Sequence, residues 1–233
     1  MRRRFLIALP PLAAPAVLLA TLAPASRAGA RLPPQPGEPA AEALLERLRR
    51  GGLVLFIRHA DTGGQPCDRS FRLGEREGQR NLSPAGQGQA RALGARLAAL
   101  GIPLQWPVLA GPVFRARDTA ELALGAERVR IEDGLVADDY AGARLGWSLE
   151  QHRRLFGTPP APGLNRVLVG HRGPAQMILG DAVRGTRLPE AGVLVLEPRR
   201  AGAAGENGRE GFRLLGILQA VPALNGGNPG CGG

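Results

Sequence analysis

The sequence predicts an α/β fold, a three-layer α/β/α sandwich with a mainly parallel central sheet. Segments of strand length alternate along the chain with segments of helical spacing, which is typical of a parallel sheet covered by helices on both faces. Two predicted strands, Leu53–Ile57 and Arg166–Val169, are almost continuously apolar, as expected for strands buried on both sides. The chain has 233 residues and is 44% hydrophobic, so we expect one domain with a sizeable core.

The remaining elements follow in order along the chain. Residues 40–50 have helical spacing, and Gly51 and Gly52 end that helix. A second helix is predicted over Pro84–Leu100, with Ser83 as its N-cap and apolar side chains at steps of three and four residues. Further strands are expected at Pro107–Leu109, Val129–Ile131, Val193–Leu196 and Phe212–Leu218, and further helices at Arg115–Leu124, Leu149–Leu155 and Pro174–Leu179.

Residues 1–28 are predicted to be a signal peptide. Arginines at positions 2–4 precede an apolar run from Phe5 to Leu22, and small residues then offer cleavage after Ala28 or Ala30. Residues 2–6 resemble the twin-arginine export motif. The alternative is an uncleaved membrane anchor, but four prolines within residues 10–24 favour cleavage. We therefore expect an exported protein of the periplasm or cell exterior, with no stable membrane insertion after cleavage.

The rest of the chain divides into three parts. Residues 29–42 are expected to form a proline-rich tether, residues 43–221 the folded domain, and residues 222–233 a glycine-rich tail. The two cysteines, Cys67 and Cys231, either form a disulfide in an oxidising compartment or remain as two thiols.

The charge of the chain favours an anionic partner. It contains no lysine, so all 30 basic residues are arginines, which bind phosphate or carboxylate through a planar fork. Cleavage after Ala28 removes four of them and leaves 26 arginines against 20 acidic residues, a net charge of +6. Acidic residues are mixed in throughout, so this is not the clustered basic surface of a nucleic-acid-binding protein. No oligomeric state is predicted.

Polar side chains follow the apolar strands at the edge where α/β proteins bind ligands. Arg58 and His59 come directly after the first strand, and His171 and Arg172 follow the fourth, while Arg115 follows the second. Two histidines in equivalent positions indicate a shared site. A metal site is the rival, but the chain has no motif with metal-ligand spacing, and the neighbouring arginines would repel a cation. An anion site fits better.

Four segments in order resemble motifs of the histidine phosphatase superfamily. "FIRHADT" resembles its Arg-His-Gly motif with Ala60 in the glycine's place, and "NLSPAGQGQARALGARL" resembles its Leu-Ser-x-x-Gly-x-x-Gln-Ala helix. "GPVFRARDTAELAL" resembles its Ser-Pro-x-x-Arg-Ala segment with Gly111 where serine is usual, and "VLVGHRGP" resembles the strand before its second histidine. The resemblance covers roughly residues 52–220 and is nearest to short, exported phosphoglycerate mutase-like phosphatases of bacteria.

The resemblance implies phosphoryl transfer through a phosphohistidine, without metal or cofactor. Neutral His59 would attack phosphorus as the nucleophile. Arg58, Arg115 and Arg172 would hold the phosphoryl oxygens, and His171 would donate a further hydrogen bond. Thr62 could add a hydroxyl contact to the substrate, although it reads equally well as a simple loop threonine.

The resemblance also implies a carboxylic acid in the loop after Val129–Ile131, which would protonate the leaving group. The family pattern places this acid at Ala137, so the carboxylate is displaced or absent here. Asp138 is the first choice and Asp139 the second. The other candidates are Glu132 and Asp133, and an acidic surface loop is the alternative reading for each.

An insertion at residues 64–81 is predicted to shape substrate specificity, because loops beside a catalytic strand commonly form the rim of its site. The insertion contains four arginines, Arg69, Arg72, Arg76 and Arg80. They suit a substrate with a second anionic group, such as a phosphorylated fragment of an envelope glycolipid. The alternative is that the insertion is a solvated loop with no contact to substrate. The predicted function is a metal-independent phosphomonoesterase acting on a phosphorylated small molecule or such a fragment. A phosphomutase and a non-catalytic anion-binding protein of the same fold are the alternatives.

If the signal peptide is removed during export, the mature chain should begin at one of two residues. Sequencing the amino terminus of the protein secreted by a bacterial host should give Gly29 or Arg31, because the small residues before each are suited to signal peptidase. A mature chain that begins at Met1 would contradict the prediction.

Overall fold

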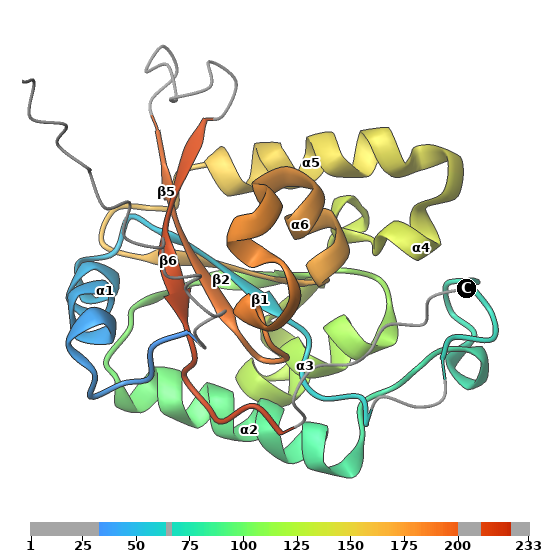
Figure 1. The fold of residues 1–233 in the computed structure, drawn as a ribbon, viewed down its shortest axis with the longest axis horizontal. Helices are drawn as coiled ribbons and strands as arrows, with labels where there is room; N and C mark the ends of the chain where they lie inside the picture. The colour runs from blue at the N-terminus through green and yellow to red at the C-terminus, as the bar shows by residue number, and fades with distance from the viewer. Residues whose placement is uncertain (1–32, 64–66, 200–210, 225–233) are drawn as a thin grey trace, which may run out of the picture.

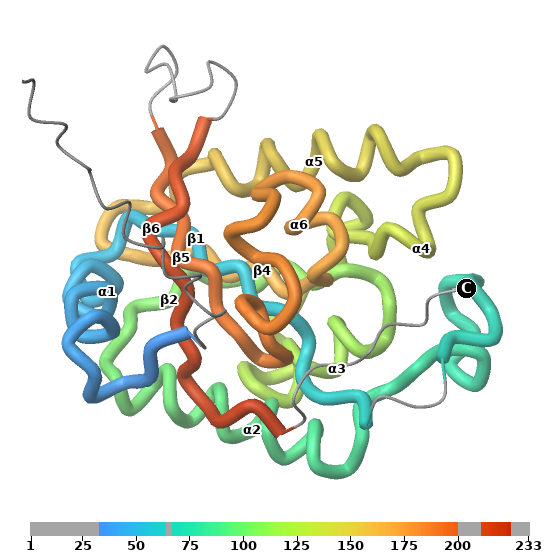
Figure 2. The backbone as a smooth tube through the Cα atoms, viewed as in Figure 1, coloured from blue at the N-terminus to red at the C-terminus, as the bar shows by residue number. Residues whose placement is uncertain are grey.

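A six-stranded sheet forms the centre of the molecule in the computed structural model, which describes residues 33–63, 67–199 and 211–224 (Figures 1 and 2). The strand order is β3-β2-β4-β1-β5-β6. The pairs β1–β4, β2–β4 and β2–β3 are parallel, and β1–β5 and β5–β6 are antiparallel. The predicted α/β fold with a mainly parallel sheet is therefore confirmed.

The predicted strands are all present, and most differ from the prediction by one to three residues at an end. The strands are β1 (Val54–Arg58), β2 (Leu104–Ala110), β3 (Val129–Ile131), β4 (Asn165–Gly170), β5 (Val193–Pro198) and β6 (Phe212–Leu218). The α-helices are α1 (Pro39–Arg50), α2 (Pro84–Ala99), α3 (Phe114–Leu124), α4 (Asp138–Ala141), α5 (Leu145–Gly157) and α6 (Arg172–Leu179). The short helix α4 was not predicted.

Helices cover both faces of the sheet, as Figure 1 shows. On one face, α1, α2 and α3 pack against alternate strand residues such as Leu55 and Ile57. On the other face, α5 and α6 pack against the intervening residues, such as Val54 and Phe56. Because side chains alternate along a strand, β1 must be apolar at every position to serve both layers. This explains the continuous apolar run that precedes Arg58.

The amino-terminal boundary of the domain differs from the prediction. The helix α1 begins at Pro39, and Ala41, Leu45 and Leu48 are buried in the core. The expected division between tether and domain at residues 42 and 43 therefore falls inside α1. The predicted signal peptide and most of the predicted tail lie outside the described residues. Within the described residues, none of the helices combines the length and apolar character needed to cross a membrane.

The Ser83 hydroxyl caps α2 as predicted. It accepts a hydrogen bond of 2.9 Å from the amide of Gly86 and donates one of 2.5 Å to Asp61. Asp61 follows β1 by three residues, and its own amide donates to Gln89 of α2. These contacts fix the chain just after His59 to the start of α2.

Candidate active site

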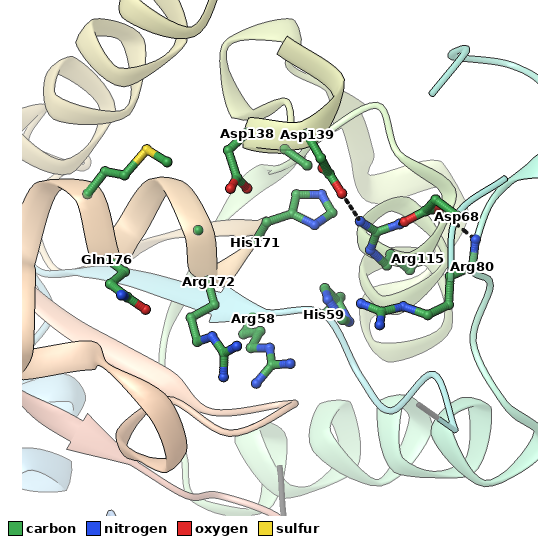
Figure 3. A pocket seen from close by; sticks show the side chains of 13 residues that line it. Arg58, His59, Asp68, Arg80, Arg115, Asp138, Asp139, His171, Arg172 and Gln176 are labelled. Atoms are coloured by element: carbon green, nitrogen blue, oxygen red, sulfur yellow. Dashed lines mark hydrogen bonds and ion pairs between the residues drawn. The ribbon is translucent and has the colours of Figure 1, made fainter. Parts of the chain in front are cut away.

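The carboxyl ends of β1 and β4 and the start of α3 meet at one edge of the sheet, around a cavity of about 480 Å³ (Figure 3). In the parallel β1–β4 pair, Arg58 lies opposite Gly170, so His59 and His171 leave the sheet side by side. Their ring centroids are 5.4 Å apart. All predicted site residues except Thr62 line the cavity: Arg58, His59, Arg80, Arg115, Asp138, His171 and Arg172.

His59 is held in the form that a nucleophile requires. Its Nδ1 lies 2.8 Å from the carbonyl oxygen of Ala60, which can only accept, so Nδ1 carries the proton and Nε2 has the lone pair. Burial of the ring, followed by the charges of Arg58 and Arg115, holds the pKa of His59 well below its usual range. The imidazole is therefore neutral at neutral pH.

Arg58 is a buried cation with a fixed orientation. Its Nη1 donates to the carbonyl oxygen of Leu188 at 3.0 Å, and its Nη2 lies 3.3 Å from Oε1 of Glu190. Burial lowers the pKa of Arg58 to about 10, against the opposing effect of Glu190, so the group remains positive at neutral pH. Thr62 donates to the same Glu190 oxygen at 3.4 Å. Thr62 lies outside the cavity lining, so this geometry does not support the predicted contact with substrate.

His171 directs an unsatisfied ring toward the same space. Only 3% of the residue is exposed, and neither ring nitrogen has a hydrogen-bond partner in the described part of the chain. Burial, together with the charge of Arg115, holds the pKa of His171 well below its usual range. A neutral ring carries one N–H, which a bound anion would satisfy. Beside it, Arg172 donates to the carbonyl oxygen of Gly185 at 3.1 Å and lines the cavity.

The insertion does not form the predicted arginine-rich rim. Arg69 donates to the carbonyl oxygen of Glu77, Arg72 pairs with Glu75, and Arg76 pairs with Asp118. None of these three arginines lines the cavity, whereas Arg80 does.

The insertion instead places a carboxylate, Asp68, in the cavity wall, where it contacts Arg115. No sequence pattern indicates this role, because one aspartate among the charged residues of a loop does not stand out.

The chain after β3 reaches the cavity, and Asp138 and Asp139 both line it. Burial raises the pKa of Asp139, and the charges of Asp138 and Asp68 act in the same direction against that of Arg115. Oδ2 of Asp139 lies 3.7 Å from Nη2 of Arg115 (Figure 3). The other two candidates, Glu132 and Asp133, do not line the cavity.

Two glycines lie where this segment approaches other parts of the chain closely. A Cβ atom at Gly173, in the first turn of α6, would lie 2.1 Å from Oδ1 of Asp138. A Cβ atom at Gly111 would lie 2.3 Å from the carbonyl oxygen of Leu135. Gly111, which replaces the serine of the family motif, is therefore required by the close approach of the segment that leads to Asp138.

Cys67, next to Asp68, is in a disulfide bond, whereas Cys231 lies outside the described residues. Of the two readings of the cysteines, the one with a free thiol at position 67 is therefore wrong. Among the described residues, no group of three or more histidine, cysteine, aspartate or glutamate side chains is arranged to hold a metal ion.

The fold and site define an α/β protein with two neutral histidines and several arginines around one cavity of small-molecule size. Residues 54–140 match the family model of the histidine phosphatase superfamily (branch 1). The matched range contains His59, Arg58 and Arg115, and His171 lies beside them in space. Over this range the chain is similar to the histidine phosphatase superfamily. A search of curated proteins found no match.

Three of the solved structures to which this chain is similar are phosphatases or hydrolases by their descriptions. The protein histidine phosphatase SixA, complexed with tungstate, is 14% identical over 72% of this chain and 97% of its own, with a TM-score of 0.44. A mycobacterial glucosyl-3-phosphoglycerate phosphatase is 20% identical over 71% and 97%, with a TM-score of 0.42. A structure described as mycobacterial hydrolase 2 is 21% identical over 70% and 88%, with a TM-score of 0.42. Similarity at this level carries no information on substrate or mechanism.

Proposed function

We propose that the protein is a metal-independent phosphomonoesterase that acts through a phosphohistidine at His59. The observation that carries the proposal is the state of His59, a neutral ring whose Nδ1–H is bound to Ala60 and whose Nε2 has a lone pair, among the cavity arginines. Only a neutral imidazole can attack phosphorus, and fixed positive charge beside it stabilises the charge of the transition state.

The reaction has two steps. In the first, a bond forms between Nε2 of His59 and phosphorus while the ester P–O bond breaks, and the leaving oxygen takes a proton from a carboxylic acid. In the second, water attacks phosphorus, the N–P bond breaks, and the carboxylate takes the proton of the water. Arg58 and Arg115 stabilise the phosphoryl oxygens in both steps, and the N–H of His171 adds a neutral donor.

Asp139 is the better supported proton donor of the two neighbouring aspartates. A donor must hold its proton near the working pH, and burial raises the pKa of Asp139. Asp138, which the sequence favoured, lies against Gly173 at the start of α6 and stands as the alternative. Both side chains lie on the side of the cavity away from Arg58 in Figure 3.

The charge of the cavity indicates which phosphate esters fit. Four arginines and three aspartates line it, and Asp139 is neutral while it holds the proton that it donates, so the excess is two positive charges, which a dianionic phosphoryl group neutralises. A second anionic group on the substrate would meet Asp138 and Asp139, contrary to the preference expected from the sequence. A neutral polyol or sugar, or an amino alcohol, can instead donate hydrogen bonds to these carboxylates. A phosphorylated sugar released from an envelope glycolipid belongs to this class.

Export remains part of the proposal. The disulfide at Cys67 supports it, because such bonds persist mainly in oxidising compartments outside the cytosol.

The nucleophile is tested by label transfer. His59→Ala should abolish hydrolysis of p-nitrophenyl phosphate, and wild-type activity should survive EDTA. Phosphate trapped on the wild-type protein should be acid-labile, alkali-stable and located at His59. His171→Ala is the control: loss of one donor should lower kcat about a hundredfold while the label still forms at His59. Label at another residue would contradict the mechanism, and phosphate binding without any turnover would favour an anion-binding protein.

The proton donor is tested with two leaving groups. Asp139→Asn should lower kcat about a hundredfold for an alkyl phosphate and far less for p-nitrophenyl phosphate, whose leaving group needs little protonation. Because the folded-state pKa of Asp139 is raised above the ordinary 3.8, wild-type activity on the alkyl phosphate should fall as pH rises through that pKa, when the donor loses its proton. The acid limb, from protonation of His59, should lie well below pH 6.5. A selective loss with Asp138→Asn would instead assign the role to Asp138.

Substrate charge is tested with a matched pair of esters. Glycerol 3-phosphate and 3-phosphoglycerate differ at one carbon, which carries a hydroxyl in the first and a carboxylate in the second. We expect kcat/KM for glycerol 3-phosphate to be about tenfold higher or more, since like charges facing each other cost binding energy. Asp138→Asn should narrow the difference. A preference for 3-phosphoglycerate would contradict the inference and bring back the phosphomutase alternative.

A further inference from the structure

Asp68 lines the cavity, yet the proposed reaction gives it no part. Its side chain is only 6% exposed, so its carboxylate is almost completely removed from water. A buried carboxylate is costly unless hydrogen bonds and opposite charge compensate it. The contacts that compensate it therefore show what it does.

Asp68 is fixed by donors from three parts of the chain. Nη1 of Arg115 lies 3.1 Å and 3.2 Å from its two carboxylate oxygens. The hydroxyl of Tyr140 donates to Oδ1 at 2.6 Å, and the backbone amide of Arg80 donates to Oδ1 at 2.7 Å. Burial and this hydrogen bond raise the pKa of Tyr140, so its hydroxyl remains a donor at neutral pH.

Arg115 is oriented as a result. Its Nη1 is committed to Asp68, and its Nη2 meets Asp139 only as an ion pair at 3.7 Å. Its Nε is buried and has no hydrogen-bond partner among the described residues. Nε–H and the adjacent Nη2–H form one edge of a guanidinium, the edge that binds two oxygens of a phosphate in parallel. Asp68 thus holds the guanidinium by one nitrogen and leaves this edge for an anion.

We propose that Asp68 is a positioning residue, which orients Arg115 for the transition state of phosphoryl transfer. This inference rests on the proposed function and adds a residue to it. Such orientation matters because an aligned donor need not reorganise as charge develops, whereas a small misplacement of a group costs a large factor in rate.

The opposite possibility is that Asp68 acts as a substrate mimic, whose carboxylate occupies the place of phosphate and must leave before substrate binds. The contacts argue against this. Departure of Asp68 would remove the acceptor of the Arg80 amide and the shorter of the two hydrogen bonds of the Tyr140 hydroxyl. It would also leave Nη1 of Arg115 without its carboxylate.

Asp68→Asn separates the two possibilities, because asparagine keeps the size of the side chain and removes its charge. If Asp68 positions Arg115, kcat of the variant on p-nitrophenyl phosphate should fall about ten- to hundredfold. Its KM should be unchanged or lower, because one negative charge has left the cavity. Binding of vanadate, which mimics the transition state, should weaken about tenfold by calorimetry, and binding of inorganic phosphate should not. A substrate mimic predicts a higher kcat and tighter binding of both anions.

Asp118→Asn is the matched control. Asp118 pairs with Arg76 of the same insertion at 2.6 Å and 2.9 Å, and neither residue lines the cavity. Its kinetic constants should equal those of the wild type. If Asp68→Asn behaved like Asp118→Asn, losing at most thermal stability, Asp68 would be merely structural and the inference would be wrong.

A double variant shows whether Asp68 acts through Arg115. In an Arg115→Ala background, Asp68→Asn should cause little further loss of kcat, because the group that it orients is gone. Full additivity of the two losses would overturn the inference. An inactive wild type would refute the proposed function instead, and the vanadate and phosphate measurements would still decide the role of Asp68.

Discussion

The parallel pairing of β1 with β4 is the constraint on which the site depends. Arg58 lies opposite Gly170 in this register, and the amide of His59 continues the ladder by donating to the carbonyl oxygen of Gly170 at 3.0 Å. A shift of one residue would turn His59 to the other face of the sheet. Because the strands are buried on both faces, their apolar side chains fix the register, so the core also sets the distance between the two histidines.

Each deeply buried arginine of the site is paired with a carboxylate. Glu190 lies beside Arg58, and Asp68 lies beside Arg115. An isolated cation at these positions would be too costly, and a fully neutralised one would not attract phosphate. A single carboxylate beside each arginine fixes the orientation of the guanidinium group. The N–H groups that do not contact the carboxylate remain available to bind an anion. The two histidines need no such carboxylate, since burial beside these cations lowers their pKa values and keeps the rings neutral.

The rim of the cavity shows how local packing determines chemistry. Gly111 and Gly173 let the segment around α4 approach so closely that Asp138 and Asp139 reach the cavity. The serine that the family motif has in place of Gly111 would collide with the carbonyl oxygen of Leu135. Departures from a family motif can therefore reflect a repacked neighbour rather than loss of activity. Here the close approach brings two carboxylates into the wall of the cavity.

The sequence by itself determined the α/β fold, the strands and the placement of Arg58, His59 and His171 at one edge of the sheet. These follow from local patterns, because apolar runs mark buried strands and polar residues after them lie at the strand ends. Tertiary structure alone decided the place of Asp68, the turn of Thr62 toward Glu190 and the pairing of three loop arginines away from the cavity. The reason is physical: a charged loop side chain takes whichever partner lies near in space, and sequence spacing does not encode contacts across 47 or 128 residues.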